Sequence, residues 1–226
     1  MKRNWCIPPK ADAAFVAAME DVLDIYCMPY NKCVPVINMD EQTYQRLDHT
    51  RELLPMKPGE IERVDYEYER CGTASIFLFT ETLGNWRKVS VRERRTAVDW
   101  AEEIKMLLEI DYPDAEKVIL ICDNLNTHSI NSLYKAFPPA KARELAKKLE
   151  IHHTPKHDSW LNIAECELSV LTRQCLKRRI PKIENLRDLT QKWEKRRNTV
   201  QKRICWQFKT EDARIKLRNV YPLIQS

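Results

Sequence analysis

The sequence has little of what would mark a membrane, secreted or low-complexity protein. Only three of its 226 residues are glycine, and no stretch approaches the roughly 20 apolar residues that a membrane helix requires. No apolar run follows the basic amino-terminal residues, so they do not resemble a secretory signal. We therefore expect a cytoplasmic protein with no membrane partner.

Signatures of zinc sites and of disulfide frameworks are missing too. None of the eight cysteines forms a C-x-x-C pair, and none lies at zinc-finger spacing from His152, His153 and His157. Disulfide frameworks are rare in cytosolic chains of this size. Because free cysteines are usually small buried side chains, we expect most of these thiols to lie in the core.

Charge is present in abundance but is distributed unevenly. The net charge is +5, yet residues 173–226 contain sixteen Lys and Arg against five Asp and Glu. Residues 1–172 contain 22 Lys and Arg against 28 Asp and Glu. A basic carboxyl-terminal part on an otherwise acidic chain indicates a polyanionic partner, although a merely solvated helix face would have the same composition.

Hydrophobic patterning predicts alternating strands and helices. Amphipathic or apolar spacing predicts helices at 12–27, 97–110, 139–150 and 159–179, with basic helices after them. The predicted strands are 34–40, 74–80, 86–91, 118–122 and 150–154, whereas residues 43–73 are polar and predict an irregular segment. This order predicts an α/β protein with a mixed sheet and helices on its faces.

Two of the predicted strands end in an acid. Asp40 ends the first, and Asp123 follows the apolar run VILIC. Side chains beyond the carboxyl ends of strands gather at one edge of a sheet, and their carboxylates suit a hard cation. Glu165, at the border of the buried stripe of the 159–179 helix and one turn after Asn162, is the third candidate. Each acid alone is better explained by a turn, a cap, or a solvated or ion-paired side chain, but the predicted order of elements would bring all three together.

The residues around these acids resemble a known family. VINMDEQT, VILICDNLNTH and HHTPKHDSWLNIAE are similar to the three signature blocks of the bacterial insertion-sequence transposases in the mariner superfamily. DYEYERCGTASIFLF, RRTAVDWAEEI and LSVLTRQCLKRRIP are similar as well, so the resemblance covers roughly residues 5–222. The most specific blocks are S-W-L-N-x-x-E and D-N-x-x-T-H.

The resemblance implies a DDE transposase that cuts and joins DNA. Its expected fold is RNase H-like: a mixed five-stranded sheet flanked by helices, with a basic helical carboxyl-terminal part. Residues 34–180 would form the catalytic core, 1–33 a helical lead-in packed on it, and 181–226 an extension of the same domain. The expected partners are double-stranded DNA, as transposon ends and target, and a second copy in a homodimer.

By motif position, Asp40, Asp123 and Glu165 match the catalytic triad, which would hold two Mg²⁺ ions, with Mn²⁺ as a substitute. Supporting roles fall to Asn124, to Asn162 and to His128, which would either approach a phosphate or serve in capping and packing. Glu41 should point to the opposite side of the extended chain from Asp40. The expected DNA-binding residues are Lys177, Arg178, Arg179, Lys195, Arg196 and Arg197.

The chain departs from the family pattern in three places. The 41 residues between Asp123 and Glu165 exceed the usual gap, and the extra length falls at 138–150, which we interpret as a surface insertion. Asp158 stands where many relatives have a small residue. Only 39 residues precede Asp40, so the usual helix-turn-helix modules are expected to be missing and DNA binding to show little sequence preference. Two other interpretations stay open: a different RNase H-like endonuclease, and an inactive remnant that binds DNA non-specifically.

Overall fold

The computed structural model describes residues 11–51, 58–59, 66–155, 159–200 and 206–222. The strands are β1 (Val36–His49), β2 (Tyr68–Glu81), β3 (Arg87–Arg92), β4 (Val118–Cys122) and β5 (Leu149–His153). The helices are α1 (Ala13–Tyr26), α2 (Ala97–Met106), α3 (Ile130–Ala136), α4 (Pro139–Lys148), α5 (Ile163–Leu171), α6 (Ile183–Val200) and α7 (Thr210–Lys216). Short helical turns are η1 (Leu107–Asp111), η2 (Ser159–Leu161), η3 (Thr172–Leu176) and η4 (Arg218–Val220). None of the helices in these ranges is long and apolar enough to cross a membrane.

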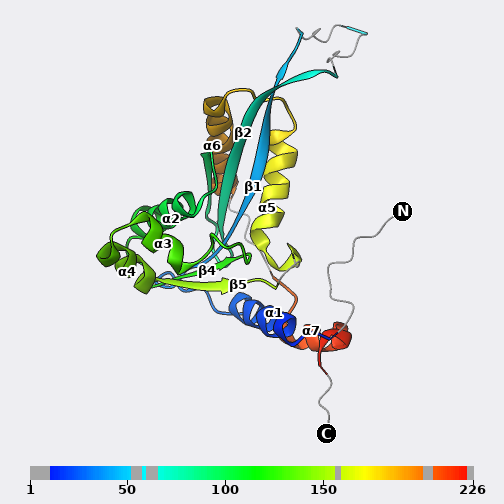
Figure 1. Cartoon of the computed structure of the whole chain (residues 1–226). Helices are drawn as coiled ribbons and strands as arrows, with labels where there is room; N and C mark the ends of the chain where they lie inside the picture. Colours follow the sequence, from blue (N-terminus) through cyan, green and yellow to red (C-terminus); the bar gives the residue numbers. More distant parts are fainter. Residues whose placement is uncertain (1–10, 52–57, 60–65, 156–158, 201–205, 223–226) are drawn as a thin grey trace.

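The strands form one mixed sheet in the order β3-β2-β1-β4-β5. The first three strands along the chain pair antiparallel, whereas β4 runs parallel to both β1 and β5. Parallel neighbours need a crossover connection, and helices occupy both crossovers here. In Figure 1 the long β1–β2 ribbon stands upright while β4 and β5 lie across its base, so the sheet is strongly twisted. The predicted α/β sheet is thus confirmed.

Strand β1 continues well past Asp40, where the sequence predicts its end. It pairs with β2 as far as His49 opposite Tyr68, so the 43–73 segment is strand at both its ends rather than irregular. In this outer ribbon the side chains of β1 are mostly partly exposed and those of β2 mostly exposed, and Figure 1 shows the ribbon rising beyond the helices. Pairing between the two strands satisfies the backbone N–H and C=O groups of the ribbon, whatever its side chains are. Hydrophobic patterning therefore did not predict these strand residues. Residues 52–57 and 60–65 lie outside the described residues.

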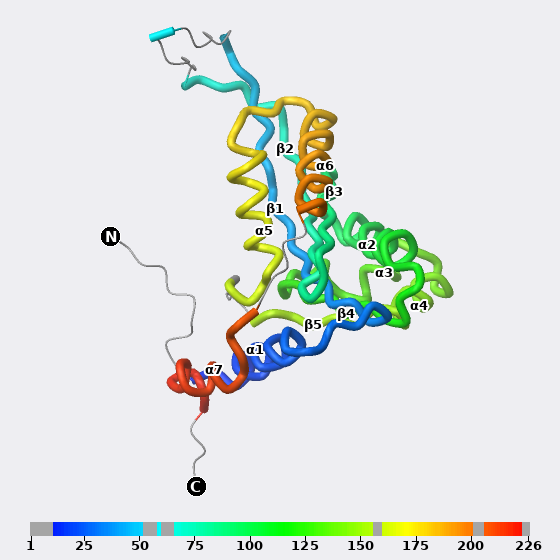
Figure 2. The backbone as a smooth tube through the Cα atoms, turned by 180° about the vertical axis from the view of Figure 1, so that it is seen from behind, coloured from blue at the N-terminus to red at the C-terminus, as the bar shows by residue number. Residues whose placement is uncertain are grey.

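Helices cover both faces of the sheet. On one face α2, α3 and α4 bury Trp100, Ile104, Leu133, Ala142 and Leu145 against sheet residues such as Met39, Phe77 and Leu120. On the other face α5 and α6 bury Leu168, Leu171, Leu186 and Trp193 against Ile76, Leu78 and Val89. Seen from behind in Figure 2, α5 and α6 run along the upright strands, apart from the α2–α4 group. The helices therefore shield the central part of the sheet from water on both faces, while the outer β1–β2 ribbon stays exposed.

Helices α1 and α7 pack together at the β5 end of the molecule (Figure 1). Together with Val36, Ile119 and Ile121 of the sheet they form a third apolar core. The acidic side of α1 is matched by partners from elsewhere in the chain: Glu20 by Arg214, Asp21 by His152, and Asp24 by Thr210. The carboxyl-terminal helix thus returns to the amino-terminal one.

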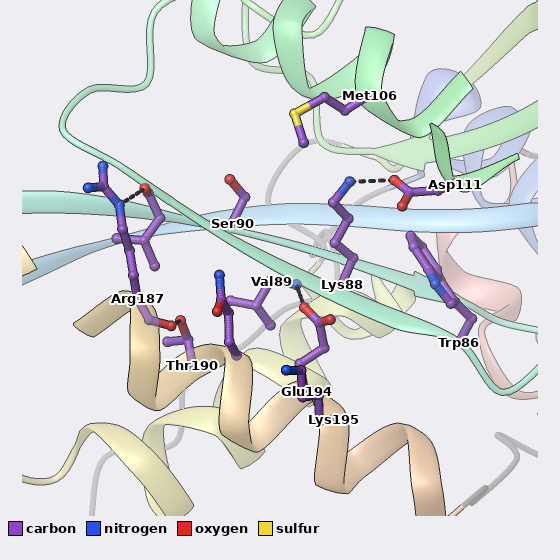
Figure 3. Close-up of a pocket in the computed structure, with 12 residues that line it drawn as sticks. Trp86, Lys88, Val89, Ser90, Met106, Asp111, Arg187, Thr190, Glu194 and Lys195 are labelled. Carbon is purple, nitrogen blue, oxygen red and sulfur yellow. Dashed lines mark hydrogen bonds and ion pairs between the residues drawn. The ribbon is translucent and has the colours of Figure 1, made fainter. Parts of the chain in front are cut away.

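Helix α6 covers the β3 edge of the sheet. Glu194 accepts a hydrogen bond from the backbone N–H of Val89 at 2.7 Å, as Figure 3 shows. The Asn198 amide both accepts from the N–H of Arg87 at 2.9 Å and donates to its carbonyl at 2.8 Å. An open groove of about 330 Å³ lies over this β3–α6 contact. Because an unpaired edge strand invites pairing with another chain, these side chains protect β3.

Two further expectations need correction. Cysteines are less buried than predicted: Cys27, Cys33 and Cys166 are exposed and Cys71 is partly exposed, while Cys122 and Cys175 are buried. The exposed ones lie at a helix end, in a turn and on the outer face of α5, outside the apolar stripes. Cys6 and Cys205 lie outside the described residues.

The 138–150 segment is more than a surface insertion. It forms α4, whose Ala142 and Leu145 are buried in the first core. Lys148 at its end donates hydrogen bonds to the carbonyls of Leu108, at 3.0 Å, and Tyr112, at 2.8 Å. Sequence analysis did not predict this burial, because α4 is mostly polar and only two of its residues form the buried apolar face. Asp158, whose role the sequence left open, is not among the described residues.

Candidate active site

Asp40 and Asp123 occupy matching positions on neighbouring parallel strands. The last aligned pair of β1 and β4 is Asn38 with Ile121, and each aspartate lies two residues beyond its member of that pair. From there β1 continues only along β2, so the two strands part where the two acids stand. Parallel pairing thus brings both carboxylates to one end of the sheet.

Glu165 approaches the same end from the first turn of α5. The cap of this helix is Asn162, whose side-chain oxygen accepts from the N–H of Ala164 at 3.1 Å. The amide nitrogen of the same side chain donates to the carbonyl of Met39 at 3.2 Å, directly before Asp40. A capping side chain that also bonds to β1 fixes the start of the helix against the strand. The structure therefore holds the backbone of Glu165 beside that of Asp40.

A buried polar network lies beneath these acids. The hydroxyl of Tyr26 donates to the carbonyl of Leu161 at 2.6 Å and accepts from the amide nitrogen of Asn38 at 2.9 Å. The oxygen of that amide accepts from the hydroxyl of Thr82 at 3.0 Å. Because buried polar groups are costly unless they are bonded, this set of partners defines one arrangement of α1, β1 and the start of α5.

Asp40 has a carboxyl group that resists ionisation. Burial raises its pKa to about 7, and the charges of Glu165, Asp123 and Glu41 add to the effect, while a hydrogen bond from the Glu41 N–H opposes it. Like charges act on one another in this way only at short range. The three acids of the predicted triad are therefore close enough to influence one another's ionisation.

Asp123 has a basic neighbour as well. Its Oδ1 lies 2.6 Å from Nδ1 of His128, and Nε2 of the same ring lies 2.8 Å from Oε2 of Glu41. Burial alone would lower the pKa of His128, but hydrogen bonds with Asp123, Cys122 and Glu41 outweigh it and raise that pKa to about 12. Likewise burial would raise the pKa of Asp123, but His128 holds it below its ordinary value. Only 1% of the His128 side chain is exposed, which keeps it from reaching a DNA phosphate.

Asn124 links the ends of two strands. Its amide nitrogen donates to the carbonyl of Thr154 at 2.6 Å, and the N–H of Thr154 donates to the carbonyl of Cys122 at 3.0 Å. The N–H of Leu125 donates to the carboxylate of Asp123 at 3.1 Å. These bonds shape the loop that carries Asp123.

The basic residues predicted to bind DNA divide into two groups. Four have exposed side chains: Lys177, Arg178, Lys195 and Arg196. The other two are engaged within the protein. Arg179 donates to the carbonyl of Glu67 at 2.7 Å, and Arg197 lies 2.9 Å from the carboxylate of Glu167.

The acids at this end of the sheet fit a divalent cation by their chemistry. Within the described ranges, no three His, Cys, Asp or Glu side chains are grouped tightly enough, as they stand, to enclose a metal ion. The donors of the predicted triad are nevertheless all carboxylate oxygens, the ligands that Mg²⁺ prefers. Burial and, to a lesser extent, repulsion from neighbouring carboxylates raise the pKa of Asp40, and a bound cation would offset both effects by favouring the ionised carboxylate.

Sequence reasoning missed two residues of this region. It set Glu41 aside as pointing away from Asp40, without foreseeing its contact with His128, 87 residues further along the chain. It placed Tyr26 within the predicted 12–27 helix but gave it no polar role, although its hydroxyl bonds to Asn38 and Leu161. No local pattern signals either contact, because both partners come from distant segments.

Three structures of the Mos1 mariner transposase are similar to this chain. The paired-end complex with Mn has a TM-score of 0.55 at 14% identity, covering 87% of this chain and 59% of that chain. The strand transfer complex has a TM-score of 0.56 at 13% identity, covering 86% and 58%. The paired-end complex with Mg has a TM-score of 0.54 at 13% identity, covering 99% and 68%.

This chain thus spans less than two thirds of the first two transposase chains. At such low identity the likeness concerns the fold alone, and it confirms the predicted RNase H-like arrangement of a mixed five-stranded sheet flanked by helices. No curated protein is significantly similar to the sequence. The family model described as DDE superfamily endonuclease matches residues 35–187, more than half of the chain, and this span includes all three acids. The chain therefore belongs to the DDE superfamily endonucleases.

Proposed function

We propose that this chain is the catalytic part of a DNA transposase from the bacterial insertion-sequence branch of the mariner superfamily, with Asp40, Asp123 and Glu165 as its triad. One observation carries the proposal: two aspartates follow the same aligned strand pair, and Asn162 ties the helix of Glu165 to the residue before Asp40. Membership of the endonuclease family supports it. The likeness to mariner structures supports the fold in which such a triad would work.

The triad would hold two divalent cations, Mg²⁺ in the cell with Mn²⁺ as a substitute. When bound, such a pair activates a water molecule or a 3′-hydroxyl and stabilises the leaving 3′-oxygen. The protein's share is to fix the carboxylates: Asp40 through β1, Asp123 through its strand end, and Glu165 through the capped start of α5. Two of the Mos1 structures are described as complexes with Mn and with Mg, which favours the same choice of ions here.

The proposed substrate is double-stranded DNA, as transposon ends and as target, in the bacterial cytosol. The Mos1 structures are described as paired-end and strand transfer complexes, and a homodimer would let this chain hold two ends as well. The exposed basic residues Lys177, Arg178, Lys195 and Arg196 would contact phosphates, whereas Arg179 and Arg197, which were also expected to do so, are engaged by Glu67 and Glu167. Replacing Lys195 and Arg196 with alanine should lower the slope of log affinity against log salt by about 0.9 for each phosphate that is no longer neutralised.

The test is cleavage of a labelled transposon-end duplex in Mg²⁺ or Mn²⁺. Asp40→Asn and Asp123→Asn should each cut at least about 100-fold more slowly, since losing even an outer partner of a metal ligand costs 10- to 100-fold. Asp188→Asn is the matched control, because Asp188 is an exposed acid on α6 whose carboxylate pairs with Lys192. Cleavage that survives both substitutions of the triad would refute its assignment.

The same assay separates the competing interpretations. Joining of the cut 3′-end to a target plasmid is expected of a transposase, whereas an endonuclease of another kind would cut without joining. An inactive remnant would bind the duplex through its basic residues and leave it intact with either metal. The transposase proposal therefore requires both a cut and a joined product.

A further inference from the structure

A continuous line of contacts runs from Asp123 into the protein interior. His128 lies 2.6 Å from Asp123 through Nδ1 and 2.8 Å from Glu41 through Nε2. Arg95 follows, 3.8 Å from the other oxygen of Glu41. The side chains of His128 and Glu41 are only 1% and 3% exposed, whereas those of Asp123 and Arg95 are each 50% exposed. Two buried polar side chains thus connect an exposed acid with an exposed base.

The imidazole ring of His128 is held in one orientation. Both of its nitrogens are engaged by carboxylates, and its face stacks on Trp100 with ring centroids 5.9 Å apart. Rotation of the ring would break both contacts at once and would take from the buried Glu41 carboxylate its imidazole partner, which is costly in a low-dielectric interior. Because the His128 ring is fixed, it can also fix the orientation of the Asp123 carboxylate beside it.

We propose that His128 and Glu41 are positioning residues for Asp123. His128 holds one oxygen of Asp123, so that the other is directed toward Asp40 and Glu165, and Glu41 fixes the orientation of His128. The proposal rests on the proposed function, because it takes Asp123 as a metal ligand. Carboxylate and imidazole partners of metal ligands commonly orient them in this way, and losing one weakens metal affinity about 10- to 100-fold.

A direct ligand role for His128 does not fit the same geometry. Both nitrogens already face carboxylates, and the side chain is almost completely buried. Glu41 is almost as buried, and its two carboxylate oxygens face Nε2 of His128 and the guanidinium of Arg95. The two residues therefore act through Asp123 rather than on a cation or a DNA strand.

Mn²⁺ binding to the full chain, measured by electron paramagnetic resonance of the free ion, tests this role without any cleavage step. His128→Ala and Glu41→Ala should each weaken Mn²⁺ binding about 10- to 100-fold. His128→Asn keeps an amide nitrogen near the position of Nδ1, and Glu41→Gln keeps an acceptor for Nε2. Each of these two variants should recover part of the affinity that its alanine counterpart loses.

Ser132→Ala is the matched structural control. Ser132 is also buried beside this segment, and its hydroxyl donates to the carbonyl of Thr127 at 2.7 Å without touching Asp123. Its replacement should lower the unfolding midpoint but leave Mn²⁺ affinity unchanged. If His128→Ala does not fold, by circular dichroism, Glu41→Gln and His128→Asn still decide the matter.

Three results would count against these ideas, in distinguishable ways. Unchanged affinity in His128→Ala, with weakened affinity in Asp123→Asn, would overturn the positioning role alone. Equal losses in the alanine, conservative and Ser132→Ala variants would reduce the role to general stability and overturn it as well. Unchanged affinity in Asp123→Asn would instead overturn the proposed function on which the inference rests.

Discussion

Two glutamates of helix α5, Glu165 and Glu167, stand in opposite electrostatic surroundings. Glu167 faces the β3–α6 contact, where Arg197 lies at 2.9 Å and Arg87 at 3.3 Å from its carboxylate. Glu165 faces β1, where its charge adds to those that raise the pKa of Asp40. Two residues apart on a helix, side chains point about 200° away from each other. One helix can therefore direct Glu165 and Glu167 into two different environments.

The two glutamates mark two kinds of region: one in which a buried carboxylate is paired with arginines, and one in which several carboxylates repel one another. At the β3–α6 contact the buried carboxylate is neutralised by arginines of the same chain. At the strand ends Asp40 is surrounded by the charges of Glu165, Asp123 and Glu41. Repulsion kept in place by a rigid scaffold is typical of functional sites, where stability is given up for activity.

The largest expected effect on stability comes from the first region. Glu167→Ala would leave Arg87, whose side chain is 1% exposed, without this partner, and should lower the free energy of unfolding by about 3–5 kcal/mol. Glu165→Gln removes repulsion and should not destabilise the protein. Urea unfolding measures the free energy of unfolding of both variants. Equal destabilisation by the two substitutions would contradict the difference that we infer between the two regions.

An exposed acid provides the control for that experiment. Glu144 on α4 has a side chain that is 67% exposed and pairs with Lys141. Glu144→Ala should cost about 1 kcal/mol or less, since exposed ion pairs contribute little. A loss as large as that of Glu167→Ala would mean that burial of the pair is not the cause.

Tyr26→Phe tests the network beneath the acids. The substitution leaves the Leu161 carbonyl without its donor and the Asn38 amide without its acceptor, and unsatisfied buried groups cost about 1–3 kcal/mol each. The network lies beneath the acids proposed as the triad, so its loss should slow cleavage as well as lower the unfolding midpoint. Unchanged unfolding in urea would show that water replaces the hydroxyl.

Asn162→Ala should have a smaller effect on stability. It removes both the cap of α5 and the bond to Met39, and loss of a helix cap costs about 0.5–2 kcal/mol. Asn162→Asp keeps a capping oxygen but loses the donor to Met39, so it should recover stability without recovering cleavage. Full recovery of both would limit Asn162 to capping.

The smallest effect concerns pH and the contact between α1 and β5. Burial lowers the pKa of His152, but hydrogen bonds to Asp21 and Glu150 outweigh it and raise the pKa above the ordinary 6.5. The Glu150 carboxylate is shared with Lys117 at 2.6 Å. The charged His152 therefore stabilises the fold fully below about pH 6.5 and loses this contribution as pH rises through the raised pKa.

His152→Gln should flatten that dependence above pH 6.5, by about 1 kcal/mol or less because the partners are partly exposed. Thermal unfolding midpoints of the two proteins across this range provide the measurement. An identical pH profile for His152→Gln and the unsubstituted chain would assign the dependence to another group.

The sequence was sufficient where a hydrophobic pattern has one face to bury. The buried stripe predicted for the 159–179 helix is formed by apolar residues that are all buried: Leu161, Ala164, Leu168, Leu171 and Cys175. The apolar run VILIC is the fully buried β4. Both follow from burial periodicity, which depends on neighbouring residues alone.

It was insufficient where a contact joins distant segments. The outer half of β1 forms because β2 pairs with it, although its own residues are polar. Glu167 is buried because Arg87 and Arg197 meet it from β3 and α6. Likewise, His128 can contact both Asp123 and Glu41 only after the sheet has formed. The sequence singled out the three acids that we propose as the triad, but it gave no sign of the side chains that surround them.

Single-turnover cleavage of a labelled transposon-end duplex by Glu165→Gln and Glu167→Gln is the most direct test of the account. Both substitutions remove one charge from α5, two residues apart, and both proteins are assayed in Mg²⁺ where unfolding curves show them folded. The account predicts that Glu165→Gln loses cleavage by at least about 100-fold while Glu167→Gln still cuts. Cleavage by Glu165→Gln at the rate of the unsubstituted chain would contradict it.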